Sequence, residues 1–118
     1  VSGNAGCFGT VADVARFGEA VRAGGVFGAP TRARLLSPQS TPPGHTLAFF
    51  CAPNPLTPAG DLLSDAAVGH SGYTGTVLTI DPAHELTVAV LTNAVYGDGK
   101  DDWLQTRRRV LNAVAGAV

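Results

Sequence analysis

Apolar side chains recur at helical spacing close to the start of the chain. Thr10 followed by Asp13 has the form of an N-terminal capping box, in which a hydroxyl and a carboxylate satisfy amides that the first helical turn leaves unpaired. The positions that follow share one helical face: Val11, Val14, Ala15, Gly18 and Val21, with Phe17 at its margin. Gly24 and Gly25 can take the left-handed backbone that ends a helix. The pattern predicts a helix within residues 9–25.

A second apolar stripe with helical spacing closes the chain. Asp101 or Asp102 is the candidate cap, and the stripe consists of Trp103, Leu104, Arg107, Val110, Leu111, Val114 and Val118. We expect Trp103 to lie in the core and the three arginines at 107–109 to lie on the solvated side of this helix. A shorter helical turn is predicted at residues 31–36, ahead of Ser37 and Pro38.

Residues rich in β-branched and apolar side chains lie between these helices. Strands are predicted at residues 68–72, 76–80 and 86–92, and residues 81–85 join the last two as a hairpin. The run from Leu86 to Leu91 is apolar nearly throughout, so we expect both of its faces to be covered. Residues 37–61 are proline-rich and irregular, apart from a strand predicted at residues 46–51. The order predicts an α+β fold, with an antiparallel sheet flanked by helices.

Composition and charge narrow the classes of protein. The chain has 118 residues, 45% of them hydrophobic, which suits a single globular core and argues against general disorder. Only 14% of the residues are charged and the net charge is -1, so nothing favours binding to nucleic acid or to an acidic membrane. No apolar stretch approaches the roughly 20 residues that span a bilayer.

One segment, residues 69–76, concentrates groups that can do chemistry. It holds one imidazole, four hydroxyls and three glycines at the end of a predicted strand. The glycines let a ligand approach the backbone closely, and amides at such a strand end can stabilise a developing oxyanion. By composition alone, a hydroxyl-rich turn leading into the hairpin is an equally good reading.

This segment and its surroundings resemble the C-terminal part of a serine β-lactamase-related hydrolase, the family of class C β-lactamases, D-alanyl-D-alanine carboxypeptidases and related esterases. The resemblance runs in order through most of the chain. It comprises the glycine-rich residues 3–10 with Asp13, Ala15, Arg16 and Phe17, the Leu35-Leu36-Ser37-Pro38 turn, His70-Ser71-Gly72 with residues 73–76, the strand from Val77 to Pro82, and the run from Leu86 to Asn93. It implies a β-lactamase/transpeptidase-like fold.

The resemblance also implies roles for individual residues. His70-Ser71-Gly72 occupies the place of the family's Lys-Thr-Gly box, so His70 would hydrogen-bond the reacting groups and support proton transfer. Ser71 would offer a hydroxyl to the substrate, and Gly72 would keep the strand surface open. Tyr73 would supply an oxyanion-hole N–H, and Thr74 completes the candidate substrate-binding residues. No cofactor is implied.

The family's nucleophile is missing from this chain. The family attacks with a Ser in a Ser-x-x-Lys motif, but the only lysine here is Lys100, and Gly97 stands three residues before it. The Tyr-x-Asn or Tyr-x-Ser element is absent as well. We therefore expect residues 1–118 to be the C-terminal part of one β-lactamase-like domain, inactive alone, with the nucleophile upstream of Val1. Such a piece would associate with a complementary N-terminal part or with itself.

Alternatives to this reading remain open on the sequence. A non-catalytic module could keep the sheet and bind a ligand or partner through residues 69–76. Cys7, in a glycine-rich stretch before a helix, is a second candidate nucleophile, and it could instead pair with Cys51. A metal site lacks ligand spacing, because Val88 stands where a His84-Glu85 zinc motif needs its second histidine, and residues 97–100 read as a turn rather than a phosphate loop. Relatives work on cell-wall peptides outside the cytoplasm, but cytoplasmic esterases share these motifs.

Overall fold

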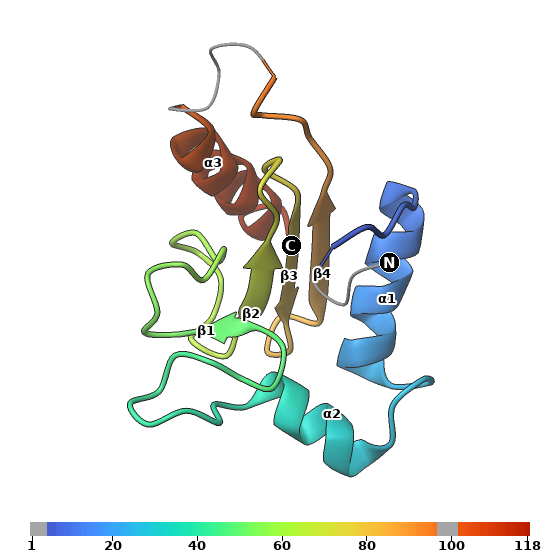
Figure 1. The fold of residues 1–118 in the computed structure, drawn as a ribbon. Coiled ribbons are helices and arrows are strands. Elements are labelled where there is room, and N and C mark those ends of the chain that lie inside the picture. The colour runs from blue at the N-terminus through green and yellow to red at the C-terminus, as the bar shows by residue number, and fades with distance from the viewer. Residues whose placement is uncertain (1–4, 97–101) are drawn as a thin grey trace.

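The computed structural model describes residues 5–96 and 102–118, which form an antiparallel sheet with helices on both sides (Figure 1). The strand order is β1-β2-β3-β4, and every neighbouring pair is antiparallel. The strands are β1 (Phe50–Cys51), β2 (Val68–Ser71), β3 (Val77–Asp81) and β4 (Leu86–Val90). The helices are α1 (Val11–Ala23), α2 (Ala29–Leu36) and α3 (Trp103–Ala115). The predicted α+β class is confirmed.

Helix α1 begins and ends where the sequence predicts. The Thr10 hydroxyl accepts the Asp13 N–H, and the Asp13 carboxylate accepts the Thr10 N–H at 3.0 Å, which completes the capping box. Gly24 ends the helix with φ +96°, a backbone angle that a Cβ would strain. Gly18 and Val21 are the buried residues of this helix, and Val14 packs against the core.

The irregular segment contains less strand than predicted. Residues 46–51 were expected to be extended, yet only Phe50–Cys51 forms a strand. The Thr46 hydroxyl accepts the N–H groups of Ala48 and Phe49, and the Thr46 N–H donates to the Phe49 carbonyl at 2.8 Å. This local turn competes successfully with the sheet for the backbone, as hydroxyl side chains do. The helix before it, α2, starts at Ala29, two residues earlier than the predicted turn.

Strand β3 is one of the two inner strands of the sheet, and all five of its residues are buried. Strand β4 was expected to be covered on both faces, but only Val88 is buried and its other residues are half-buried. The reason is position: β4 pairs with β3 on one side and, among the described residues, with no strand on the other. The hairpin predicted between these strands is confirmed, with Glu85 at φ +51° in its turn.

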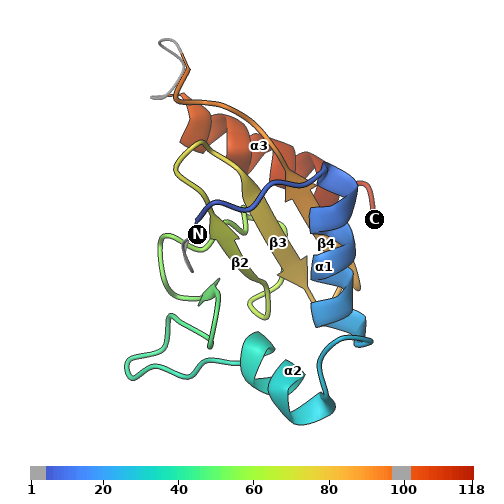
Figure 2. The same ribbon diagram turned by 45° about the vertical axis from the view of Figure 1, so that its right-hand side comes forward.

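Helices α1 and α3 lie on opposite sides of the sheet (Figure 2). Leu111 is the buried residue of α3, whereas Trp103, expected in the core, is half-buried near the start of that helix. Arg107 is also half-buried, and only Arg108 and Arg109 are on the solvated side as predicted. The main core cluster lies on the α1 side and consists of Val21, Leu35, Phe49, Cys51, Val68, Leu78 and Ile80.

Candidate functional site

The candidate site residues lie where β2 ends and the chain turns into β3. Strand β2 contains His70 and Ser71, and a tight turn follows in which the Gly72 N–H donates to the Thr76 carbonyl at 2.8 Å. Gly75 has φ +91°, and a Cβ there would lie 2.7 Å from Trp103 Nε1, so both the backbone angle and the packing require glycine. The turn is held further by the Ala94 N–H, which donates to the Thr74 carbonyl.

His70 and Ser71 point to opposite faces of the sheet. In an antiparallel pair, residues directly opposite one another share a face, and successive residues alternate. His70 is opposite Leu78, whose side chain lies against α1 near Gly18, so His70 is on the α1 face. Ser71 is opposite Val77 and takes the other face, towards α3. The two side chains therefore leave the strand on opposite faces, although both residues border the same cavity.

A cavity of about 690 Å³ opens on the α1 side of this strand end. His70, Ser71 and Gly72 form part of its wall, together with Thr76. The rest of the lining is mainly apolar and comes from Cys7, Phe8, Gly9, Asp13, Val14, Phe17, Val77, Leu78 and Leu91. The imidazole of His70 is exposed, so it can exchange protons with a molecule bound in this cavity.

One carboxylate shares the cavity with His70. Hydrogen bonds from the Thr10 backbone and hydroxyl hold the pKa of Asp13 below its ordinary value. Asp13 is therefore ionised near neutral pH and places a negative charge in the wall of a mainly apolar cavity. Sequence reasoning identified Asp13 as a helix cap and missed its place in the cavity wall, because that place depends on how α1 packs against the sheet.

A smaller cavity of about 340 Å³ lies on the α3 side, lined by Ser71, Gly72, Tyr73, Gly75, Ala94, Val95, Trp103, Leu104 and Arg107. The Trp103 Nε1–H is buried there without a hydrogen-bond acceptor among the described residues. Ser71, Gly72 and Tyr73 thus face a second space with a different lining. Tyr73 and Thr74 are exposed, and Thr74 lines neither of the two cavities.

An aromatic side chain that sequence reasoning did not single out touches His70. The rings of Phe50 and His70 are stacked with centroids 4.8 Å apart, and the His45 ring lies against Phe50 at 5.1 Å. The sequence carries no signal for this contact, because it depends on the pairing of β1 with β2.

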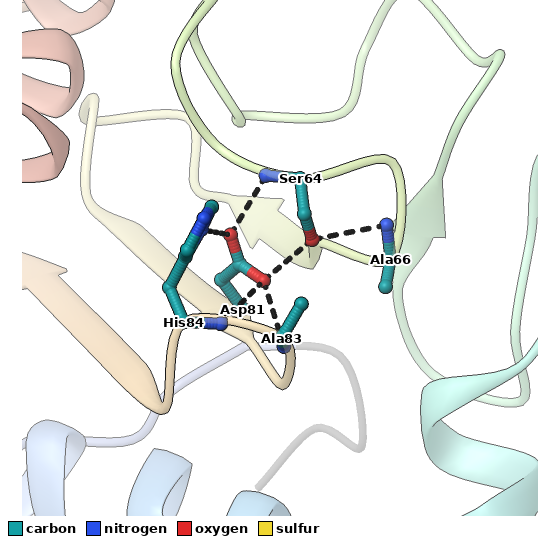
Figure 3. Close-up of polar contacts among 5 residues, drawn as sticks. All are labelled: Ser64, Ala66, Asp81, Ala83 and His84. Atoms are coloured by element: carbon teal, nitrogen blue, oxygen red, sulfur yellow. Dashed lines mark hydrogen bonds and ion pairs between the residues drawn. The ribbon is translucent and has the colours of Figure 1, made fainter.

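The remaining candidate side chains are two cysteines and a hairpin histidine. Cys7 is exposed on the cavity wall and Cys51 is buried, and both thiols are free. His84, expected as a solvated hairpin residue, is half-exposed, and its Nδ1–H donates to the buried Asp81 carboxylate at 2.7 Å (Figure 3). Lys100 and the turn predicted at residues 97–100 fall outside the described residues, as do Asp101 and the first residues of the glycine-rich entry. No helix of the described chain is both long and apolar enough to cross a membrane.

The sequence is similar to a known family model and to parts of two known proteins. The profile of the family described as "Beta-lactamase" matches residues 2–111. The chain is 33% identical over 101 residues to a protein of Escherichia coli (strain K12) described as "Putative D-alanyl-D-alanine carboxypeptidase", a match that covers 79% of this chain and 23% of that protein. It is 56% identical over 34 residues to a Bacillus subtilis (strain 168) protein described as "N-acetylmuramyl-L-alanine amidase", covering 29% of this chain and 8% of that protein. The chain thus spans less than a quarter of the length of these relatives. No solved structure gives a significant match.

Proposed function

The chain belongs to the beta-lactamase family of serine hydrolases, and on that premise we propose that it is the C-terminal part of an enzyme that works through an acyl-enzyme. The acyl group would be transferred from a β-lactam, a D-alanyl peptide or an ester to a serine outside residues 1–118, and then to water or another acceptor. One observation supports the proposal most directly. His70-Ser71-Gly72 lies where β2 ends and forms part of the wall of a cavity of about 690 Å³.

Each candidate residue has a role in this proposal. His70 holds and moves a proton at an imidazole nitrogen, close to the reacting serine hydroxyl or to the leaving group. The Tyr73 N–H donates to the oxyanion of the tetrahedral intermediate. Ser71 offers its hydroxyl to a polar group of the substrate from the α3 side, while Gly72 and Thr74 border the bound substrate where the strand ends.

The isolated chain is expected to be inactive. No serine in residues 1–118 has a lysine three positions later, so no hydroxyl here has the base that the family mechanism requires. The exposed Cys7 thiol on the cavity wall is the alternative nucleophile. A covalent adduct of an acylating probe on the isolated chain would reveal a nucleophile within it. If Cys7 forms no adduct, the chain acts as one wall of the site and depends on the rest of the protein for the attack.

The test is replacement of His70 in the complete protein. His70→Ala should lower the acylation rate about 10²–10⁴-fold, since this is the range that a positioned acid or base contributes. Folding should be unaffected, because the side chain is exposed. The rate is measured with a labelled penicillin or a fluorophosphonate, and unfolding is followed in urea.

Two controls sharpen this test. His84→Ala, at the far end of β3, should leave the acylation rate unchanged. The isolated chain should form no adduct with either probe. Wild-type acylation in the His70→Ala protein would contradict the assignment of His70, and an adduct on the isolated chain would show that a nucleophile lies within it.

A further inference from the structure

Within the part of the chain that the structure describes, no hydrogen bond fixes the orientation of the His70 ring. None of the described residues hydrogen-bonds this imidazole, and the side chain is exposed. A group that passes a proton to a substrate must nevertheless be held close to one geometry, because small displacements of reacting groups cost rate. Some other contact has to limit the rotation of the ring.

The contact that does so is the face of Phe50. The two rings are stacked, with centroids 4.8 Å apart and planes inclined by only 14°. Parallel stacking at this separation is a favourable arrangement for two aromatic rings, and it restricts the plane of the imidazole while leaving both nitrogens at its edge available. Phe50 also meets the His45 ring, with centroids 5.1 Å apart and planes inclined by 56°.

The backbone of Phe50 is anchored from two directions. Phe50 pairs with Gly69, the residue before His70, and also forms a bridge with His45. The next residue, Cys51, pairs with Val68 and donates its N–H to the Gly44 carbonyl at 3.1 Å. The ring is therefore supported by paired backbone, which is the kind of rigid support that a positioned catalytic group needs.

Phe50 also differs from its neighbours in its surroundings. Phe49 and Cys51 are buried members of the core cluster, whereas Phe50 is half-buried and outside it. Its ring is thus placed against His70 and His45 rather than against the core side chains. The titratable and charged groups near the stack are His45, whose ring contacts Phe50, and Asp13 and Cys7 in the cavity wall.

From these contacts we propose that Phe50 is a positioning residue, which holds the imidazole of His70 in the plane from which it acts. The role of His70 in this proposal rests on the proposed function, whereas the stacking of the two rings is observed independently of it. Phe50→Leu keeps an apolar side chain in β1, beside His70, and removes the flat face. Phe50→Tyr restores the face, and Phe49→Leu is a matched control that removes a neighbouring ring without touching His70.

The experiment uses the complete protein, labelled at histidine for NMR and assayed by steady-state turnover of a β-lactam or ester substrate. We expect cross-relaxation between the Phe50 and His70 ring protons in the wild type, and between the two rings in Phe50→Tyr. We expect Phe50→Leu to lower kcat about tenfold with little change in KM, because the substrate still binds while the proton acceptor is misplaced. Phe50→Tyr should recover the wild-type kcat, and Phe49→Leu should keep it even where its unfolding midpoint falls.

Two results would overturn the proposal: absence of ring contact in the wild type, or wild-type kcat in Phe50→Leu. If His70→Ala is inactive while Phe50→Leu is fully active, the positioning role fails and the proposed function stands. If His70→Ala is fully active, the proposed function fails, whatever the rings do.

Discussion

Asp81 is a buried carboxylate whose charge is fully compensated by local hydrogen bonds. It accepts the Ser64 N–H at 2.8 Å and the Ser64 hydroxyl at 2.6 Å, together with the Ala83 N–H and two N–H groups of His84 (Figure 3). The side chain is fully buried, so it has no access to water. These bonds tie the loop before β2 to the hairpin between β3 and β4, at the end of the sheet away from the candidate site.

Replacing this carboxylate should destabilise the fold and lower its sensitivity to acid. Burial alone would raise the pKa of Asp81, but the hydrogen bonds from Ser64, His84 and Ala83 outweigh it and hold the pKa below the ordinary value. A lowered folded-state pKa means that stability is fully present above about pH 4 and is lost as the pH falls through the folded value. We expect Asp81→Asn to cost about 2–3 kcal/mol at pH 7, since hydrogen bonds to a charged group are lost.

Urea unfolding of the complete protein between pH 2 and pH 7 measures both effects. Hydrogen bonds with Arg108 and Asn112 also lower the pKa of Asp61, to about 2. The pH dependence of wild-type stability therefore contains the titration of more than one carboxyl group. The contribution of Asp81 is therefore the difference between wild type and Asp81→Asn, which should shrink below pH 4. Asp65→Asn, at an exposed carboxylate nearby, is the control. A difference that stays constant with pH would contradict the assigned charge.

The packing of α1 on the sheet depends on the absence of a side chain at Gly18. A Cβ there would lie 2.5 Å from Thr87 Cγ2 and 2.8 Å from Leu78 Cδ1. Alanine stabilises a helix by up to about 1 kcal/mol relative to glycine, whereas overpacking costs about 1–3 kcal/mol. Packing should win, and we expect Gly18→Ala to lower the free energy of unfolding by about 1 kcal/mol. The double variant Gly18→Ala/Thr87→Ser, which removes the methyl group, should recover part of the loss, and a stabilised Gly18→Ala would show that α1 has room to shift.

The sequence predicted those elements that depend on interactions between residues close together in the chain. The capping box at Thr10 and Asp13 and the hairpin after β3 involve residues a few positions apart, and both predictions are confirmed. The strand predicted at residues 46–51 is confined to Phe50–Cys51, because Thr46 forms a local turn that strand propensity does not describe. The family pattern singles out residues 69–76 as the candidate site, which stays a prediction. The opposite faces of His70 and Ser71 and the stacking of Phe50 could not be predicted, since both depend on strand pairing.

At the scale of the whole molecule, one edge of the sheet and part of its apolar surface remain uncovered. Within the described residues β4 pairs only with β3, and its residues other than Val88 are half-buried. Phe8 is fully exposed beside the cavity, and Leu91 is 41% exposed just beyond β4. Unpaired strand edges and contiguous apolar surface both favour association with another chain.

We therefore expect the isolated 118-residue chain to associate, with itself or with a complementary N-terminal part of the protein, or to be only marginally stable. Light scattering at increasing concentration should show a rising mean mass, whereas the complete protein should not change. Leu91→Lys adds a charge at an exposed position where the edge strand ends, so it should shift the population towards the monomer without unfolding the chain. Adding the N-terminal part should suppress self-association, because it would cover the same edge and cavity. A stable, monodisperse monomer at every concentration would show that α1 and the segment before it already cover enough of the sheet.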